Sequence, residues 1–390
     1  MKVLRLIGGL DPGFGGPSVS SINSTIAAVR EGVKTHFAFP TDPLQPQATE
    51  NAIARLEGAA IPYTTFPLNA FPSALCRRWG ISAGLARWIR REAGKFDIVH
   101  CHSAWVMPSL VTVFGGAGGA KTILSPHESL TDFDLSQASG AVTGFLKRRL
   151  KPRYLKSFDM FVMSSALEAR DSINGDKGAA ERTETIHHPV FDEREHEPLS
   201  RPAWRGPGLK IGFFGRLHRK KNLDILIRAL ARLPDDVSLT VGGEGLEADR
   251  LHRLAAELGV TGRIEWKGFV ASADKTAFFD SIDMLAMPSD YECFGMAAAE
   301  ALVEGCAALV SPETGVAEII WAHNCGIVVA PDAGKIAAEI EKLRGDPDKM
   351  AHYSASATKA AAASLSFGAH GKSVKAAYRR LIGGTPGKAT

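Results

Sequence analysis

The sequence predicts an α/β protein of two doubly wound, Rossmann-like domains, and three observations lead to this prediction. Short apolar runs that end in Gly, Pro or Ser alternate with longer amphipathic stretches, the pattern of β-α-β units around a parallel sheet. The chain has 390 residues, too many for one comfortable core. One charged segment rich in proline and glycine divides the apolar runs into two sets.

The first set of runs predicts the sheet of the first domain. Its opening run, MKVLRLIGG, is far too short for a signal peptide and contains Arg5, so we expect it to form a buried strand. The strands of this domain are expected near residues 3–7, 35–39, 63–66, 98–101, 122–124, 160–163 and 184–186.

The second set of runs predicts a second sheet rather than the continuation of one closed barrel. An eight-fold barrel would need about 250 residues without a break. The strands of the second domain are expected near residues 210–214, 238–241, 263–266, 284–287, 308–310 and 327–329.

The segment between the two sets is a predicted linker. Residues 191–208, FDEREHEPLSRPAWRGPG, are charged and contain three prolines and two glycines. An amphipathic helix rich in Lys and Arg is predicted from about residue 367 to 381. Ligands of open α/β sheets bind beyond the carboxyl ends of the strands, so we expect the site in a cleft between the two domains.

Composition excludes several classes of protein. A formal net charge of +4 is small for a dedicated nucleic-acid binder, although it suits a phosphate-bearing ligand or an anionic membrane surface. The five cysteines are scattered without a C-x-x-C pair, which indicates reduced thiols. The sequence contains no run of 18 consecutive apolar residues, so no membrane-spanning helix is predicted. We therefore expect a cytoplasmic protein.

The strongest chemical signal is PSDYECFGMAAAEALVEG, residues 288–305. Glu292 is expected in the loop after a strand and Glu300 in the helix that follows, where they would accept hydrogen bonds from sugar and ribose hydroxyls. The alternative is a pair of ordinary solvated acids. Amides at the start of that helix are suited to bind an anionic phosphate, and they belong to Phe294, Gly295 and Met296.

A second signal is GRLHRKKNL, residues 215–223, directly after the first strand of the second domain. Arg216 supplies a forked donor and Lys221 a point charge, and the two are expected to converge on one diphosphate. Fixed cations would stabilise the charge that develops on a leaving diphosphate. The alternative is a solvated basic loop, although helix N-termini disfavour cations.

Together these motifs resemble the retaining glycosyltransferases of the GT-B fold, in particular the large family four. The family pattern G-R-L-x-x-x-K-N begins at Gly215, and its pattern E-x-F-G-x4-E-A begins at Glu292. The resemblance covers essentially the whole chain. It implies two domains that face a cleft, with residues 1–195 binding the acceptor, residues 209–366 binding the donor, and residues 367–390 crossing back to pack on the first domain.

The resemblance also implies the roles of individual residues on the donor side. Arg216 and Lys221 would hold the donor diphosphate in place of a metal ion. Glu292 and the amides after it would contact the sugar and phosphate, and Glu300 would bind the ribose. A glycine after a strand is also common in ordinary turns, so the match at Gly243 is weak by itself. Four positions match the family's donor side in this looser way: Gly243, Glu244, Phe269 and Val270.

In the first domain, the glycine-rich turn DPGFGGPSVSS places Gly15 and Gly16 at a helix start. It is not G-x-G-x-x-G, so no nicotinamide site is predicted. His127 resembles a family histidine that reaches the transferred sugar, although an isolated histidine is more often structural. His102 and Trp105, in HCHSAW, follow another strand and are candidates for the acceptor side.

Two further features have a functional and an ordinary interpretation. Asp132-Phe133-Asp134 spells the D-x-D metal motif of a different transferase fold, and we interpret it as loop acids without a metal. Residues 145–156, FLKRRLKPRYLK, and residues 77–91 mix cations with apolar side chains. They suit an anionic membrane or a solvated face, and Pro152 is expected to break or kink the helix.

The sequence thus predicts a retaining, metal-independent hexosyltransferase without a cofactor. Its partners would be a nucleotide-diphosphate sugar and a glycan or lipid-linked acceptor of surface polysaccharide synthesis (exopolysaccharide, O-antigen or lipopolysaccharide), with no nucleic acid. It would act in the cytoplasm, with the inner face of the membrane as an alternative site. A sugar-nucleotide epimerase of the same fold and a catalytically silent scaffold remain the alternatives.

Overall fold

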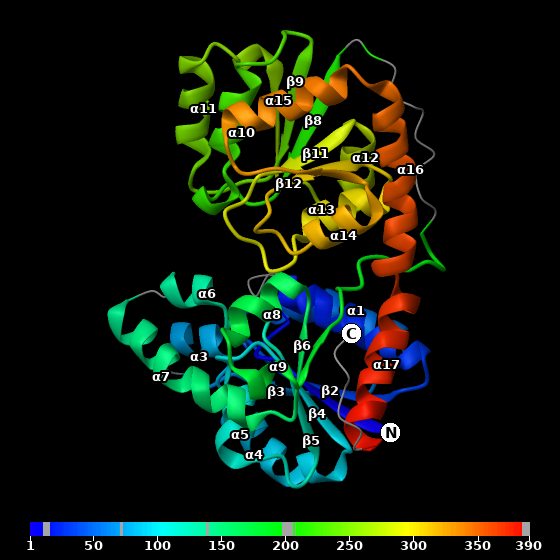
Figure 1. The fold of residues 1–390 in the computed structure, drawn as a ribbon. Coiled ribbons are helices and arrows are strands. Elements are labelled where there is room, and N and C mark those ends of the chain that lie inside the picture. The colour runs from blue at the N-terminus through cyan, green and yellow to red at the C-terminus, as the bar shows by residue number, and fades with distance from the viewer. Residues whose placement is uncertain (11–15, 71–72, 138–139, 197–205, 207, 384–390) are drawn as a thin grey trace. The chain divides into compact units, whose positions relative to one another are not determined.

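The computed structural model describes residues 1–390 apart from 11–15, 71–72, 138–139, 197–205, 207 and 384–390 (Figure 1). The chain divides into two compact units. The first unit is Met1–Pro189 with Phe367–Thr390, and the second unit is Val190–Ser366. The sequence placed the end of the first domain at residue 195. Val190 instead joins the second unit because its amide donates to the carbonyl of Leu365.

The first unit contains one parallel sheet of seven strands in the order β3-β2-β1-β4-β5-β6-β7. The order reverses between β1 and β4, which defines a topological switch point. The strands are β1 Lys2–Leu6, β2 Lys34–Thr41, β3 Tyr63–Pro67, β4 Ile98–His102, β5 Lys121–Ser125, β6 Met160–Met163 and β7 Thr183–Thr185.

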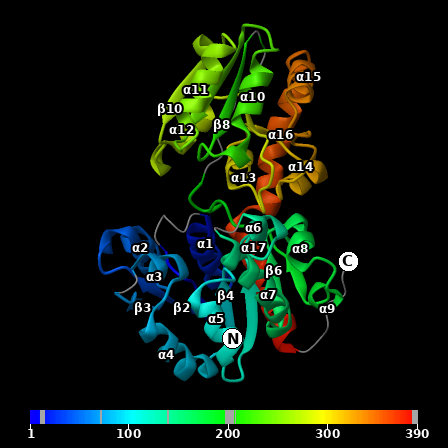
Figure 2. The ribbon, with the colours of Figure 1, turned by 90° about the vertical axis from the view of Figure 1, so that its left-hand side faces the viewer.

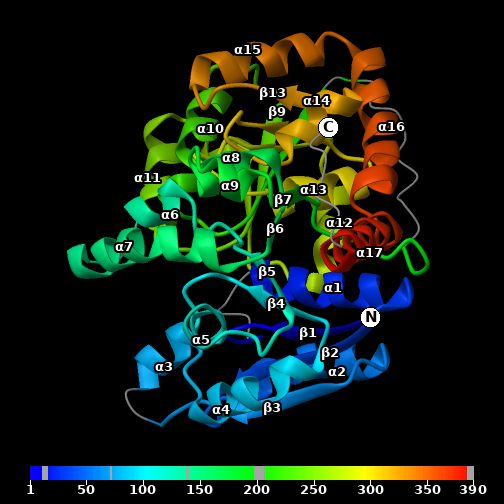
Figure 3. The same ribbon diagram turned by 60° about the horizontal axis from the view of Figure 1, so that its bottom comes forward.

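Helices cover both faces of this sheet (Figures 1 and 3). Side chains alternate along a strand, so Val3 packs toward α1 and α17, whereas Leu4 packs toward α4, α5 and α7. The helices of the unit are α1 Gly16–Arg30, α2 Glu50–Gly58, α3 Ser73–Trp79, α4 Ala83–Glu92, α5 Met107–Gly115, α6 Asp132–Ser136, α7 Ala141–Ser157, α8 Ala166–Ile173, α9 Lys177–Ala180 and α17 Phe367–Gly383.

The C-terminal helix α17 lies side by side with α1 in the first unit (Figure 3). Its Val374, Ala377 and Tyr378 are buried in the cluster that covers β1, β4 and β5. At Gly371 the helix backbones come so close that a Cβ would collide with the carbonyl oxygen of Ala27. A helix far from β1 in sequence thereby completes the core of the first unit.

Helix α7 continues from Ala141 to Ser157 with Pro152 inside it, so of the two expected effects of the proline the break does not occur. A proline in a helix interior costs about 3 kcal/mol. The turn after it buries Tyr154 and Leu155 in the core, and each large apolar side chain recovers about 1.5–3 kcal/mol. Packing of the C-terminal turn outweighs the local penalty.

The second unit contains a parallel sheet of six strands in the order β10-β9-β8-β11-β12-β13. Its strands are β8 Leu209–Phe214, β9 Val237–Gly242, β10 Ile264–Gly268, β11 Met284–Met287, β12 Ala307–Val310 and β13 Gly326–Val328. Each strand predicted from the sequence is present, with its ends within two residues of those expected. The doubly wound α/β prediction is therefore confirmed.

Helices also cover both faces of the second sheet (Figure 2). Helices α10, α11 and α15 pack on one face and α12, α13 and α14 on the other, while α16 contributes Met350 and Tyr353 to the first core cluster and Ala357, Ala360 and Ala361 to the second. Their bounds are α10 Leu223–Leu230, α11 Ala248–Glu257, α12 Lys275–Asp280, α13 Met296–Val303, α14 Ala317–His323, α15 Ala333–Arg344 and α16 Pro347–Ser364. None of the described helices in either unit is both long and apolar enough to cross a bilayer.

Candidate active site

The loops after β8 and β9 are joined through their backbones at the carboxyl edge of the second sheet. The amide of Gly215 donates to the carbonyl of Gly242 at 2.9 Å. Gly243 has φ +139°, and a Cβ there would collide with the carbonyl oxygen of Gly215. Only glycine fits so close an approach. Gly243 thus lets the loops after β8 and β9 pack together, a role that the sequence did not predict for it.

The two motifs of the second unit meet at Lys221 and Glu292. Lys221 ends a short 3-10 turn, and its Nζ lies 2.8 Å from Oε1 of Glu292. Lys220 Nζ lies 3.7 Å from the same oxygen. The next residue, Asn222, has φ +53° and donates from Nδ2 to the carbonyl of Pro288 at 2.9 Å and to Asp290 Oδ1 at 2.6 Å. Asn222 therefore fixes one motif against the other.

Glu292 is held by the chain segment that precedes α14. Its amide donates to the carbonyl of Glu313 at 2.9 Å, and its own carbonyl accepts from the amide of Gly315 at 2.9 Å. Gly295, the N-cap of α13, has φ +98°. A Cβ there would lie 2.7 Å from Thr314 Cγ2. The glycine lets the chain turn sharply from the Glu292 loop into the helix.

The start of α13 offers backbone groups rather than side chains. The first amides of a helix have no partner within the helix and carry the positive end of its dipole. Phe294 is 1% exposed and belongs to the core cluster beneath, so its side chain anchors the turn. Met296 opens the helix. This arrangement suits an anion next to the carboxylate of Glu292.

Glu300 lies about one turn into α13 and pairs with a residue that the sequence did not indicate. Lys275 Nζ lies 2.7 Å from Oε1 of Glu300 and 5.4 Å from the ring centre of Phe214. Lys275 opens α12 after a loop without a recognisable motif, so no sequence signal pointed to it. The pair leaves Glu300 partly exposed, with Lys275 over Phe214 at the carboxyl end of β8.

The remaining donor-side candidates lie on neighbouring loops. Arg216 is exposed and forms no ion pair with any described residue. The exposed Glu244 accepts a hydrogen bond from the amide of Phe269 at 3.2 Å, which joins the loops after β9 and β10. Phe269 is itself 75% exposed, whereas Val270 packs partly into the core.

In the first unit, His127 lies in the loop after β5 in an unusual backbone conformation. His127 and Glu128 have φ +51° and +74°, values that cost about 1–3 kcal/mol for residues other than glycine. The buried Glu168 holds this loop, because its Oε1 accepts from the amide of Glu128 and its Oε2 from the amide of Ser164, each at 2.7 Å. Burial raises the pKa of Glu168.

His127 belongs to a row of four histidines whose ring planes are nearly parallel. Ring centres are separated by 4.6 Å between His100 and His102, 5.3 Å between His102 and His127, and 5.3 Å between His127 and His188. His102 Nδ1 lies 3.0 Å from His127 Nε2. Burial lowers the pKa of all four imidazoles, and that of His188 falls to about 4.

A buried arginine lies at the base of this row. Arg5 on β1 is fully buried and donates to Ser24 Oγ at 2.8 Å and to Tyr378 Oη at 2.9 Å. Tyr378, on α17, lies 2.7 Å from His100 Nδ1. No carboxylate pairs with Arg5 within the described chain, so its charge also lowers the pKa of His100.

The other candidate residues of the first unit differ in how far they are buried. His102 is 2% exposed and Trp105 7%, with Trp105 donating to the carbonyl of Ser129, so both candidates for the acceptor side are buried. Gly16 opens α1 and is exposed, and Gly15 lies outside the described residues. His100 and Glu168 were missed. The spacing of His100 and His102 on one strand face was the available signal.

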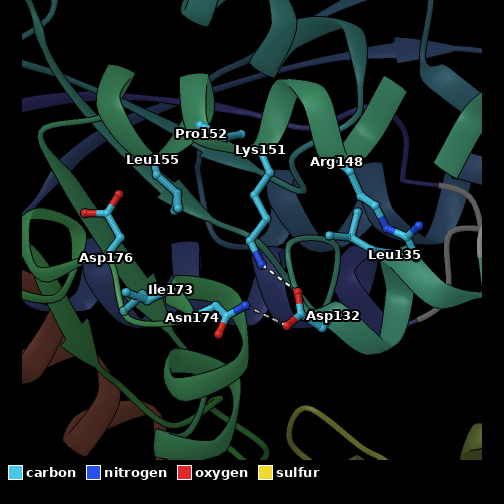
Figure 4. Close-up of a pocket in the computed structure, with 9 residues that line it drawn as sticks. All are labelled: Asp132, Leu135, Arg148, Lys151, Pro152, Leu155, Ile173, Asn174 and Asp176. Atoms are coloured by element: carbon cyan, nitrogen blue, oxygen red, sulfur yellow. Dashed lines mark hydrogen bonds and ion pairs between the residues drawn. The ribbon is translucent and has the colours of Figure 1, made fainter. Parts of the chain in front are cut away.

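The D-x-D acids also differ from expectation, since they open the short helix α6 rather than a loop. Thr131 caps this helix and accepts from the amide of Asp134. Asp134 pairs with Lys147 at 2.7 Å, and Asp132 with Lys151 at 3.0 Å and with Asn174 at 3.0 Å (Figure 4). Asp132 and Lys151 line a cavity of about 350 Å³. The carboxylate of Asp132 and the ammonium group of Lys151 already pair with each other there.

Family models match nearly the whole chain. The model described as Glycosyltransferase Family 4 matches residues 14–194, and the model described as Glycosyl transferases group 1 matches residues 200–360. The D-inositol 3-phosphate glycosyltransferase of Mycobacterium marinum is 25% identical over 95% of this chain and 82% of its own. The enzyme of the same name from Mycobacterium leprae is 26% identical over 95% and 89%.

Solved glycosyltransferase structures share the fold. HepE of Anabaena in complex with UDP has a TM-score of 0.73 at 21% identity, covering 96% of this chain and 99% of its own. Sucrose-phosphate synthase of Thermosynechococcus elongatus has a TM-score of 0.75 at 19% identity, covering 99% and 100%. With two parallel sheets, both family models and these neighbours, the chain belongs to the group 1 glycosyltransferases of the GT-B fold.

Proposed function

We propose that this glycosyltransferase is a retaining enzyme that uses a nucleoside-diphosphate sugar and needs no metal ion. The observation that carries the proposal is the meeting of two motifs in the second unit, where Lys221 lies 2.8 Å from Glu292 beside the start of α13. A cation, amides at a helix start and a carboxylate are groups that suit a sugar diphosphate.

The transfer breaks one bond and forms one. The bond between the anomeric carbon and the β-phosphate oxygen breaks, and the nucleoside diphosphate leaves with the electron pair. The acceptor hydroxyl oxygen bonds to the anomeric carbon from the same face and gives its proton to the departing phosphate. Arg216 and Lys221 stabilise the charge on the diphosphate, and His127 contacts the transferred sugar. No cofactor takes part.

Two features support metal independence: the positive side chains of Arg216 and Lys221, and the ion pairs that Asp132 and Asp134 already form. The positive side chains of Arg216 and Lys221 take the place that a divalent ion would hold at a diphosphate. Asp132 and Asp134, the acids with the spacing of a metal motif, are already engaged with Lys151, Asn174 and Lys147. Activity in EDTA tests this point directly.

We propose a glycan or lipid-linked acceptor of surface polysaccharide synthesis. Supporting this is the likeness to the lipopolysaccharide outer core galactosyltransferase WaaB, with a TM-score of 0.67 at 18% identity over 97% of this chain and 99% of its own. UDP and UDP-glucose are the first donors to test, because HepE was solved with both. D-inositol 3-phosphate, named for the mycobacterial relatives, belongs in the acceptor panel.

We further propose that the enzyme works in the cytoplasm, on the inner face of the membrane, through α7. Phe145 and Leu146 are 66% and 52% exposed at the N-terminal half of that helix, next to Arg148 and Arg149. Exposed apolar side chains among cations suit the boundary of an anionic bilayer. On the same unit, Arg153 lies 4.6 Å from the ring centre of the exposed Phe114, which extends this surface to α5.

Vesicle sedimentation tests the membrane proposal. The wild type should sediment with vesicles that contain phosphatidylserine and remain in solution with phosphatidylcholine alone. A double change, Phe145→Ser with Leu146→Ser, should abolish sedimentation, whereas Leu246→Ser should not, because Leu246 is a fully exposed leucine of the second unit. Equal sedimentation of all three proteins would refute the role of α7.

Donor binding is tested by thermal shift with EDTA present, using UDP, UDP-glucose and other nucleotide sugars. A ligand at about 100 times its Kd adds about 2.7 kcal/mol to stability. Glu300→Ala should lose the shift. Glu339→Ala is the matched control, because Glu339 pairs with Lys342 at 2.6 Å on a helix surface of the same unit. A shift that survives in Glu300→Ala would contradict the assigned ribose contact.

The alternatives are separated by what happens to the donor. An epimerase would consume the nucleotide sugar without an acceptor and release no transfer product, and a silent scaffold would consume none. Retention is read from the anomeric proton coupling of the first product formed. An inverted anomer would overturn the retaining assignment while leaving glycosyl transfer intact.

A further inference from the structure

The hydrogen bond between His102 and His127 joins a buried histidine to a partly exposed one. His102 lies on β4 and is 2% exposed, whereas His127 lies in the loop after β5 and reaches the surface. Their Nδ1 and Nε2 atoms are 3.0 Å apart, and the ring planes are within 21° of each other. Two neutral imidazoles hold one proton between these atoms, so one ring donates and the other accepts.

The surroundings of His102 decide which ring donates. Its other nitrogen, Nε2, is buried and has no hydrogen-bond partner within the described chain. If His127 donated, His102 would carry its own proton on Nε2 as an unpaired buried N–H. Unpaired buried N–H groups are rare, and an unpaired acceptor is tolerated better. The placement with the proton on His102 Nδ1 is therefore favoured.

A directed chain of hydrogen bonds on the other side of His102 agrees with this placement. Arg5 can only donate, so the Tyr378 oxygen accepts from it and the Tyr378 hydroxyl donates to His100 Nδ1. His100 then carries its proton on Nε2, which donates to Ser125 Oγ at 2.9 Å. Ser125 keeps its own hydroxyl hydrogen.

Ser125 and His102 line the same small cavity. The cavity measures about 20 Å³ and is lined by Ser125, Ser164, His102 and His127 among others. This volume holds one water molecule. The Ser164 hydroxyl already donates to Glu168 Oε2 at 2.7 Å, whereas Ser125 accepts from His100 and keeps its hydrogen, so this lining favours an acceptor at His102 Nε2. Both sides of the His102 ring thus agree on one tautomer.

We propose that His102 is a positioning residue that donates from Nδ1 to Nε2 of His127, fixing His127 in the tautomer with its proton on Nδ1. This rests on the proposed function, in which His127 contacts the transferred sugar. His127 then presents a hydrogen-bond donor, not an acceptor, to a sugar or phosphate oxygen. Its strained backbone, held by Glu168, fixes the position of the ring, and His102 fixes its proton.

The test is the tautomer of His127 in the free enzyme, which needs neither donor nor acceptor. The full chain is labelled with 15N-histidine, and two-bond proton–nitrogen correlations report which ring nitrogen is protonated. His127→Gln identifies the signals of His127. We expect the Nδ1–H pattern in the wild type, and a shift toward the Nε2–H form in His102→Leu.

Two variants separate positioning from a general loss of structure. His102→Asn places an amide N–H where Nδ1 stood, so it should restore the Nδ1–H pattern of His127. His36→Leu is the matched control, because His36 is another half-buried histidine of the first unit, bonded to Thr64 outside the row. It should leave the His127 signals unchanged. An unchanged tautomer in a folded His102→Leu protein would overturn the proposal.

Turnover of UDP-glucose distinguishes this proposal from the proposed function. His102→Leu should lower kcat by about 10- to 100-fold, the usual effect of losing a group that orients a functional histidine, with KM for the donor little changed. His102→Asn should recover most of it. Normal turnover in His127→Gln would remove the role of His127 itself, whereas loss in His127→Gln with normal kcat in His102→Leu would remove only the role of His102.

Discussion

Lys221 and Glu292, which belong to two separate sequence motifs, form an ion pair with Nζ and Oε1 2.8 Å apart. Each side chain is only 13% exposed. Asn222 holds the two loops together from the next position by donating to the carbonyl of Pro288 and to Asp290. The pair therefore lies in a rigid frame at the carboxyl edge of the second sheet, where α/β proteins bind ligands.

Glu292→Gln should lower kcat/KM for the donor by about 100-fold, because the amide keeps the shape but loses the charge that orders Lys221 and the sugar. The unfolding temperature should also fall, since each side chain is only 13% exposed and removing one partner of a fully buried pair costs about 3–5 kcal/mol. Glu265→Gln, which breaks the exposed pair with Lys267, is the control and should keep full activity. Steady-state kinetics and thermal unfolding of both variants check this.

Gly295→Ala should distort the start of α13 and abolish donor binding. The new Cβ would lie 2.7 Å from Thr314 Cγ2 and 2.8 Å from Met287 Cε, at φ +98°. Gly259→Ala separates the clash from backbone strain, because Gly259 has φ +70° with nothing within 4 Å. Binding of UDP measured by calorimetry should be lost in the first variant and kept in the second. Retained binding in both would show that the helix start is not the anion site.

Glu168→Gln should destabilise the first unit by about 1–3 kcal/mol. The two carboxylate oxygens accept hydrogen bonds from the amides of Glu128 and Ser164, and in the variant the glutamine NH2 group would face one of these amides and leave it unpaired. The loop that carries His127 should then exchange its amide hydrogens faster. Glu57→Gln, an exposed carboxylate bonded to Tyr63, is the control. Hydrogen exchange followed by mass spectrometry checks the loop, and unchanged exchange at residues 126–129 would contradict the account.

The buried histidines make stability depend on pH in a defined direction. Burial lowers the pKa of His188 to about 4 and that of His370 to about 3, from 6.5. The unfolded chain therefore binds more protons than the folded chain below pH 6.5, and stability falls as the pH drops from there toward these values. The unfolding temperature should decrease between pH 7.5 and 5.

A substitution isolates the contribution of one ring to that pH dependence. His188→Phe keeps an aromatic ring beside His127 but cannot titrate, so the fall in unfolding temperature on acidification should be smaller than in the wild type. His323→Phe makes the same change in the second unit and should leave the pH dependence as it was. Identical pH curves for the wild type and His188→Phe would rule out this linkage.

The architecture was predictable because its signals are local. Continuous apolar runs such as residues 284–287 mark strands buried on both faces, and the turns after them mark the edges where ligands bind. The contact between Lys221 and Glu292 was not predicted, because it depends on β8 and β11 being neighbours in the sheet, which the two motifs do not state. The helix through Pro152 did not follow, because tertiary packing of Tyr154 and Leu155 outweighs the local penalty.

The histidine row was harder to predict because it depends on contacts between distant segments. Its members come from β4, the loop after β5, and the segment before residue 189, and Tyr378 reaches them from the far end of the chain. Only the pair at His100 and His102, two apart on one strand, was visible in the sequence. Lys275, the partner of Glu300, lies in a segment with no motif at all.

The most direct test of the central claim is kcat/KM for donor turnover in Arg216→Ala and Lys221→Ala, measured in EDTA beside the control Lys267→Ala. Lys267 is a lysine of the same unit that pairs with Glu265. We expect losses of about 100-fold or more for the first two, as for removal of an electrostatic stabiliser, and none for the control. Near-normal turnover in both Arg216→Ala and Lys221→Ala would contradict it.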